Sequence, residues 1–259
     1  MAREETESKI SSPTENPELS VVVPVHNESD NIIPLVHEIK AALDGHLNYE
    51  VVYVDDGSDD GTLEKLRSMA RQFPRLRVVR HHERCGQSAA IWTGVKAARG
   101  KWIATLDGDG QNDPQDILRI INAKGGLENL SKKVVICGHR KRRQDTWVKR
   151  ITSKIANAIR RKILKDDTPD TGCGLKVFAR EAYLSLPFFD HMHRFLPALF
   201  LSKEAKVESV EVNHRPRSKG KTHYGIKNRL GAGIVDLLGV IWLRRRMKNP
   251  IVTEEKIET

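Results

Sequence analysis

The first hundred residues alternate between short apolar runs rich in β-branched side chains and longer segments with apolar residues at helical spacing. This alternation constrains the fold strongly, because strands that alternate with helices form a mostly parallel sheet covered by helices on both faces. The pattern therefore predicts an α/β fold with Rossmann-like layers. The expected strands are 19–25, 50–54, 76–80 and 102–106, and the expected helices are 31–43, 62–72 and 87–98.

Length and composition indicate a globular protein with one main core. The chain has 259 residues, of which 39% are hydrophobic and 30% are charged, enough for one α/β core with a small appendage. No apolar stretch reaches the roughly 18 residues that a membrane span requires. Three widely spaced cysteines, Cys85, Cys137 and Cys173, form no Cys-x-x-Cys pair, which indicates reduced cytosolic thiols and argues against a zinc site.

Polar motifs follow three of the expected strands. They are 25–28 (Val-His-Asn-Glu), 55–58 (Asp-Asp-Gly-Ser) and 107–109 (Asp-Gly-Asp). Ligands of open α/β sheets bind beyond the carboxyl ends of the strands, so we expect the three motifs to share one edge. The chain has no Gly-x-Gly-x-x-Gly after its first strand and no Walker loop, which argues against NAD enzymes and P-loop ATPases.

The Asp-Gly-Asp motif has the chemistry of a site for a hard divalent cation. Asp107 and Asp109 stand on alternate residues at a strand end, so their oxygens can converge on one ion, which also accepts substrate phosphate oxygens as ligands. The alternative is a polar turn in which Asp113-Pro114 only starts a helix.

The net charge of +10 is concentrated in a few segments. Residues 139–165 hold eleven Lys and Arg against one acid, 215–229 hold six and no acid, and 244–248 hold four. Such charge indicates a polyanionic partner, namely nucleic acid, nucleotide phosphates or an anionic membrane surface, although a solvated helix face is the alternative. Aromatic residues make up only 5% of the chain and no nucleic-acid motif is present, so we expect no nucleic-acid partner.

The ordered motifs resemble the inverting GT-A glycosyltransferases that use nucleotide-sugars, from about residue 19 to residue 242. The resemblance implies a GT-A fold in which the first two motifs hold the nucleotide and the third holds Mg²⁺ or Mn²⁺ on the donor diphosphate. Residues 86–90 resemble the phosphate-side loop of the family, with Arg84 or Cys85 where Asn is usual. The implied donor-binding residues are Pro24, Val25, Asn27, Glu28, Asp55, Asp56, Gln87 and Asp107, and the implied metal ligands are Asp107, Asp109 and Gln111.

The second half of the chain resembles one branch of that family, the dolichyl- and polyprenyl-phosphate sugar synthases. The similar segments are 170–180 (Asp-Thr-Gly-Cys-Gly-Leu-Lys-Val-Phe-Ala-Arg), 193–197, 214–217 and 220–225. The last three look like the acceptor-side elements of that branch. The nearest resemblance is to short synthases without a transmembrane tail, a group that includes galacturonic acid synthases acting on dodecaprenyl phosphate. This implies a UDP- or GDP-sugar donor, with UDP-galacturonic acid favoured, and a polyprenyl-phosphate acceptor.

The chemistry of such a transfer agrees with the residues present. A divalent ion and basic groups can stabilise the diphosphate leaving group as charge develops. A phosphomonoester oxygen is already largely anionic, so it needs capture by cations rather than a general base. The candidate acceptor-phosphate residues are Arg140, Arg143, Arg150, Arg215, Arg217 and Lys221. We expect Asp109 and Asp170 to be catalytic, Asp170 as an orienter of the donor sugar rather than a base, or else as part of an Asp-Thr-Gly turn.

Two segments are expected at a membrane surface. Residues 147–164 place Ile every fourth residue with Lys and Arg between, which is typical of an interfacial helix. Residues 230–243 are apolar except for Asp236 and precede three arginines, which indicates an interfacial helix or, alternatively, a core-packing one. We expect a disordered tail at 1–18, a catalytic domain at 19–225, an interfacial amphipathic helix at 226–248 and a polar tail at 249–259. We expect the cytoplasmic protein to attach peripherally to the inner face of the cytoplasmic membrane.

Two other functions remain compatible with the sequence. One is transfer to a sugar or protein hydroxyl, and the other is a non-catalytic module that binds polyanions or lipid on a GT-A scaffold. The oligomeric state is left open.

Overall fold

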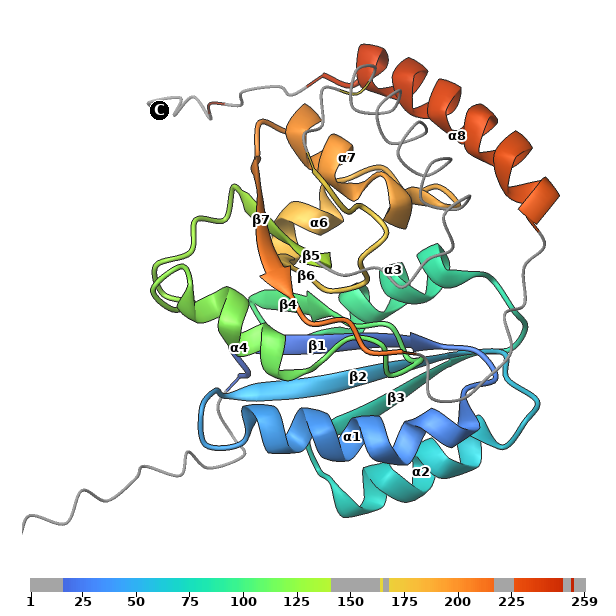
Figure 1. Cartoon of the computed structure of the whole chain (residues 1–259), viewed down its shortest axis with the longest axis vertical. Helices are drawn as coiled ribbons and strands as arrows, with labels where there is room; N and C mark the ends of the chain where they lie inside the picture. Colours follow the sequence, from blue (N-terminus) through green and yellow to red (C-terminus); the bar gives the residue numbers. More distant parts are fainter. Residues whose placement is uncertain (1–15, 141–163, 165–167, 217–225, 249–252, 254–259) are drawn as a thin grey trace, which may run out of the picture.

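The computed structural model describes residues 16–140, 164, 168–216, 226–248 and 253, without the side chains of residues 226–232 and 234. A seven-stranded sheet lies between two layers of helices (Figure 1). The elements are β1 (Leu19–Val25), α1 (Ser29–Leu43), β2 (Tyr49–Asp56), α2 (Thr62–Gln72), β3 (Leu76–His81), α3 (Gln87–Ala97), β4 (Trp102–Thr105), α4 (Gln115–Asn122), β5 (Val134–Arg140), β6 (Lys176–Ala179), α6 (Arg180–Leu184), η1 (Met192–Arg194), α7 (Leu196–Ser202), β7 (Lys206–Val212) and α8 (Ile226–Arg246). All seven elements expected in the first half are confirmed, with boundaries that differ by at most two residues.

The sheet is mixed, with the order β3-β2-β1-β4-β6-β5-β7. Strands β3, β2, β1 and β4 run parallel, β6 runs antiparallel to both β4 and β5, and β7 runs parallel to β5. The expected mostly parallel sheet is confirmed, and β6 is its antiparallel member. The order of the parallel half reverses at β1, which carries β2 on one side and β4 on the other. Such a switch point is where α/β sheets bind ligands.

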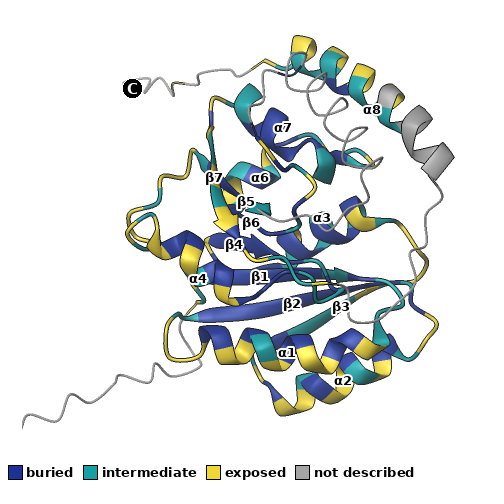
Figure 2. Cartoon of the chain, viewed as in Figure 1, coloured by how far each residue is buried: buried dark blue, intermediate teal, exposed yellow. Residues whose placement is uncertain are grey.

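Both faces of the sheet are buried, which explains why its central strands read as continuous apolar runs. Val21 and Val23 of β1 pack into one core with α1, α2 and α4, while Val22 packs into the other core with α3, α6 and α7. Figure 2 shows the buried strands between helices that are exposed only on their outer sides.

Helix α8 packs with one face only. Val240 is buried, and Leu237, Ile241 and Leu243 pack against the core on the α7 side of the sheet. The carboxylate of Asp236 bonds His191 Nδ1 at 2.9 Å, so this charge is satisfied by protein. Val235, Leu238 and Trp242 are 68%, 61% and 62% exposed. The helix therefore shares features of both alternatives, a core-packing face and an exposed apolar face. In the part of the chain that the structure describes, no helix has the length and apolar character to cross a membrane.

Helix α3 packs very closely on the sheet at Gly94. A methyl group there would overlap Val22 Cγ1 and lie 3.0 Å from Val54 Cγ2. We expect Gly94→Ala to lower the free energy of unfolding by about 1–3 kcal/mol through overpacking, measured by chemical denaturation. The matched control is Gly239→Ala on the exposed side of α8, where nothing lies within 4 Å of the added carbon. That change should be neutral or stabilising by up to about 1 kcal/mol; equal effects of the two changes would contradict the packing argument.

Candidate active site

A cavity of about 510 Å³ opens at the carboxyl ends of β1, β2 and β4, the expected common edge of the three motifs. Its volume is typical of a site for a small ligand. Of the residues expected at the site, Pro24, Val25, Glu28, Asp56, Gln87, Asp107 and Asp109 line it. Asn27, Asp55, Gln111, Asp170, Arg140 and Arg215 are not among its lining residues. Arg143, Arg150, Arg217, Lys221 and most of the basic helix at 147–164 lie outside the described residues.

Asn27 joins two loops rather than lining the cavity. It has a φ of 57°, the left-handed conformation that Asn tolerates better than most residues. Its Nδ2 donates to Asp59 Oδ1 at 2.7 Å, and its Oδ1 accepts from the Asp59 N–H at 3.0 Å. The buried Asp55 acts similarly within its own turn, where Oδ1 accepts from the Ser58 N–H. These contacts hold the ends of β1 and β2 together, so that Glu28 and Asp56 reach the cavity.

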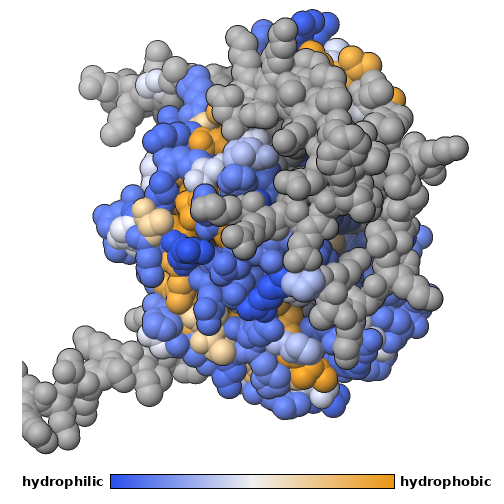
Figure 3. All heavy atoms as spheres, in the orientation of Figure 1, coloured by the Kyte–Doolittle hydropathy of each residue, from blue (hydrophilic) through white to orange (hydrophobic). Residues whose placement is uncertain are grey.

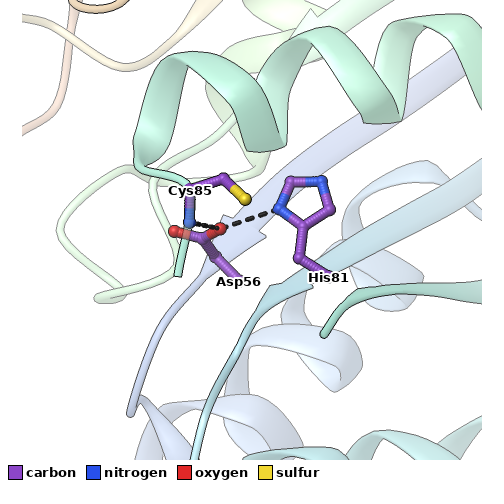
Figure 4. A group of neighbouring side chains, drawn as sticks. All are labelled: Asp56, His81 and Cys85. Atoms are coloured by element: carbon purple, nitrogen blue, oxygen red, sulfur yellow. Dashed lines mark hydrogen bonds and ion pairs between the residues drawn. The ribbon is translucent and has the colours of Figure 1, made fainter. Parts of the chain in front are cut away.

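Asp56 organises the loop before α3. Its Oδ1 bonds His81 Nδ1 at 2.7 Å and accepts the Cys85 N–H at 2.8 Å, and its Oδ2 accepts the Gly86 N–H at 2.8 Å. Asp56, His81 and Cys85 point toward one another (Figure 4), with possible ligand atoms within 4.8 Å. A thiol and an imidazole are not the ligands that Mg²⁺ or Mn²⁺ prefer. The cluster is therefore not the expected site of the donor metal, and Asp56 is held by the protein at the wall of the cavity.

Asp107 and Asp109 form the acidic part of the cavity. Gln87 Nε2 donates to Asp107 Oδ1 at 3.0 Å, and Asp109 Oδ1 accepts the Gln111 N–H at 3.1 Å. A methyl group at Gly174 would overlap the Asp107 carboxylate, so glycine is needed where that loop passes. Loss of hydration and the charge of Asp109 raise the pKa of Asp107 to about 6, against the opposing charges of Lys176 and Arg140.

These two carboxylates fit a divalent cation. Oxygen ligands suit Mg²⁺ and Mn²⁺, and an ion between two like charges would remove the repulsion that raises the pKa of Asp107. Gln111 donates its backbone N–H to Asp109, and its carbonyl accepts the Arg215 N–H. Its role as a third ligand stays a prediction.

The two expected acceptor arginines that the structure describes are engaged with carboxylates. Arg140 binds Asp170 in a bidentate pair, with Nε to Oδ2 at 2.6 Å and Nη2 to Oδ1 at 2.9 Å. Arg215 pairs with Glu38 at 2.6 Å and with Asp113 at 2.9 Å. Asp170 thus anchors the end of β5 to the loop before β6. Its role as an orienter of the sugar is not tested by this arrangement.

Three cavity residues were not assigned from the sequence. Lys176 is buried, and its ammonium donates to the carbonyls of Cys173 and Thr171. His193 and Arg194 line the cavity from η1. A lysine inside an apolar strand was a usable signal for the first. The other two belong to segment 193–197, which the resemblance placed on the acceptor side, and in the structure they line the same cavity as Asp107 and Asp109. Their position depends on a turn that the sequence does not specify.

Comparison with known proteins identifies the family. The family model described as Glycosyl transferase family 2 matches residues 20–186. The chain belongs to glycosyl transferase family 2. Dodecaprenyl-phosphate galacturonate synthase of Rhizobium johnstonii is 34% identical over 242 residues, which are 92% of this chain and 70% of that protein. Undecaprenyl-phosphate 4-deoxy-4-formamido-L-arabinose transferase of Aeromonas hydrophila is 33% identical over 210 residues, 80% of this chain. The family 2 chain spans 63% of the length of the latter relative.

Solved structures confirm the GT-A fold of this family 2 glycosyltransferase. A mannosyltransferase from Pyrobaculum calidifontis, solved with GDP-Man and Mn²⁺, has a TM-score of 0.63 at 22% identity and covers 92% of this chain and 67% of that one. Glucosyl-3-phosphoglycerate synthase from Mycobacterium tuberculosis, solved with Mn²⁺, UDP and glucosyl-3-phosphoglycerate, has a TM-score of 0.64 at 18% identity. It covers 90% of this chain and 81% of that one.

The raised pKa of Asp107 predicts a pH-dependent affinity for metal. A cation and a proton compete for this carboxylate, so affinity should be constant above about pH 7 and fall by roughly tenfold per pH unit well below pH 6. Calorimetric titration of the glycosyltransferase with Mn²⁺ at several pH values measures this. Asp107→Asn should bind weakly at every pH, and a wild-type affinity that does not change down to about pH 5 would contradict the assignment.

Proposed function

We propose that this glycosyltransferase moves a sugar, with inversion, from a nucleotide-sugar to a polyprenyl phosphate in a reaction that depends on Mg²⁺ or Mn²⁺. The observation that carries the proposal is that Asp107 and Asp109 share one cavity with Glu28 and Asp56 from the nucleotide-end motifs. The two curated relatives are named for transfer to dodecaprenyl and undecaprenyl phosphate. The proposed donor is UDP-galacturonic acid, after the first of these.

Each part of the cavity has a task in this reaction. Glu28 and Asp56 bind the nucleoside, and Gln87 holds Asp107 in place by its hydrogen bond. A metal on Asp107 and Asp109 would stabilise the diphosphate as it leaves. Lys176 adds a fixed positive charge near Asp107, since its charge lowers the pKa of that carboxylate. The acceptor oxygen is already anionic, so no general base is assigned.

Acceptor binding is assigned to the basic residues named from the sequence. Arg140 and Arg215 would have to exchange a carboxylate partner for the lipid phosphate, which a bidentate guanidinium can do with little change in geometry. Arg143, Arg150, Arg217 and Lys221 would complete this site. Transfer to a sugar or protein hydroxyl is the other candidate function. It would need a general base, and Asp170 is the candidate because it directly precedes the cavity-lining loop at 171–174.

The proposed lipid acceptor also points to a membrane surface as the partner of α8. Val235, Leu238 and Trp242 are three and four residues apart and share one helix face. The exposed Arg245, Arg246 and Lys248 follow them. Figure 3 shows hydrophobic surface over this end of α8 beside a strongly hydrophilic cap. We propose that this face lies on the inner, anionic surface of the cytoplasmic membrane, where the lipid acceptor is found.

Removing the metal ligand should abolish transfer. We expect Asp109→Ala to lower turnover by more than roughly 100-fold, because the stabilisation of the leaving diphosphate is lost. Mass spectrometry of polyprenyl phosphate incubated with UDP- and GDP-sugars measures the product. Glu64→Gln, an exposed change on α2, is the control for loss of a negative charge. Full turnover of the wild type in excess chelator would refute metal dependence, and transfer to a water-soluble sugar alone would refute the lipid acceptor.

The membrane face can be tested separately. Leu238→Ser with Trp242→Ser should weaken binding to anionic vesicles by at least roughly tenfold, because apolar burial is removed. The control is Ile33→Ser, an exposed hydrophobic residue of α1. Vesicle flotation at two salt concentrations measures both, and wild-type binding should weaken, without vanishing, at high salt. Equal flotation of the double variant and the wild type would exclude α8 as the contact.

A further inference from the structure

Two hydrogen bonds join the start of α3 to the η1 turn. Ser88 Oγ bonds His193 Nδ1 at 2.7 Å and accepts the His193 backbone N–H at 3.2 Å. The hydroxyl has one proton to donate, and we assign it to Nδ1, while the oxygen accepts the backbone proton. In this tautomer the imidazole carries its proton on Nε2. No described residue bonds Nε2, while His193 lines the cavity, so the ring offers one donor to a ligand.

The imidazole in this position carries no charge. Burial, followed by the charges of Arg194, Lys176 and His191, lowers the pKa of His193 to about 3. His193 is therefore neutral near pH 7, and the positive charge of the η1 turn at the cavity belongs to Arg194.

Arg194 differs from two other cations near the cavity. Lys176 donates to two backbone carbonyls, and Arg140 is held by Asp170. For Arg194, only its backbone N–H has a bond, to the carbonyl of His191. Among the described residues nothing pairs with its guanidinium. A half-buried guanidinium on a cavity wall is a receptor for an anionic group of the ligand.

The anchor of this turn is close to the donor side of the cavity. Gln87 contacts the metal-binding Asp107, and the next residue in α3, Ser88, holds His193. The expected acceptor residues Arg140 and Arg215 are not among the lining residues. We therefore expect an anionic group bound by Arg194 to be part of the donor sugar rather than of the acceptor, because the sugar lies next to the diphosphate.

We propose that Arg194 binds a carboxylate on the donor sugar, with the Nε2–H of His193 as a second donor and Ser88 as the residue that positions the pair. This inference rests on the proposed function and names the residues that would recognise the carboxylate of its uronic acid donor. A neutral hexose would leave the guanidinium without a partner, so the pair selects for charge as well as shape.

The test compares UDP-galacturonic acid with UDP-galactose, which differ only at the sugar carboxylate. Arg194→Ala should lower the ratio of kcat/KM for the first over the second by roughly 10- to 100-fold, the range for a hydrogen bond to a charged group. Arg194→Lys should restore part of the ratio, because a point charge remains without the planar fork. Arg67→Ala, an exposed arginine of α2, removes the same charge elsewhere and should leave the ratio unchanged.

Ser88→Ala tests the positioning role. It should raise KM for the uronyl donor and leave kcat largely unchanged. His193→Gln keeps an N–H donor and should therefore raise this KM less. Thermal melts of all variants confirm that they fold.

The outcomes separate this inference from the proposed function. A wild type that uses UDP-galactose as well as UDP-galacturonic acid refutes the inference and leaves transfer to polyprenyl phosphate standing. An equal loss with both donors and a raised KM for polyprenyl phosphate assigns Arg194 to the acceptor and refutes it too. If no lipid product forms with any donor, the proposed function fails. Calorimetric binding of the two donors to the wild type and Arg194→Ala then still decides the inference, since it needs no acceptor.

Discussion

The repulsion between two carboxylates at the end of β4 is the constraint around which the site is arranged. Burial first, and then the negative charge of Asp109, raise the pKa of Asp107 to about 6. The protein offsets this charge with Lys176 and Arg140, and Gln87 donates a side-chain hydrogen bond to Asp107. A divalent cation on these two carboxylates would complete the balance of charge.

At the opposite edge of the sheet, hydrogen-bond donors of the protein itself stabilise the charge of a buried carboxylate. The buried Glu50 at the start of β2 accepts bonds from the Ser20 hydroxyl, the Arg77 guanidinium and the Arg99 backbone N–H. Together these donors lower its pKa despite burial. Glu50 is thus fully satisfied by protein and fixes β1, β2 and β3 to one another.

The sequence predicted what depends on short-range pattern and missed what depends on long-range pairing. Continuous apolar runs and helical spacing were enough to locate every element up to β4. The motifs at the strand ends were correctly expected to share an edge, since parallel strands bring their carboxyl ends together. Asn27 bonds Asp59 instead of lining the cavity because its backbone adopts a left-handed turn. Arg215 pairs with Glu38, 177 residues away, because of the tertiary structure. Neither contact could be predicted from the neighbouring sequence.

The η1 turn joins the cavity to α8. His191, with a φ of 62°, bonds Asp236 of α8 at 2.9 Å, and two residues later His193 is held by Ser88 at the start of α3. One short turn thus fixes the position of α8 relative to the mouth of the cavity. Asp236 lies on the inner side of α8, next to the exposed Val235, so the residues that attach the helix and those it presents outward alternate along it. A lipid phosphate has to enter from a surface while its chain remains in the bilayer. If the outer face of α8 lies on that surface, the His191–Asp236 pair holds the cavity at a fixed distance from it. A phosphate whose chain stays in the bilayer can reach the cavity only if that distance is short.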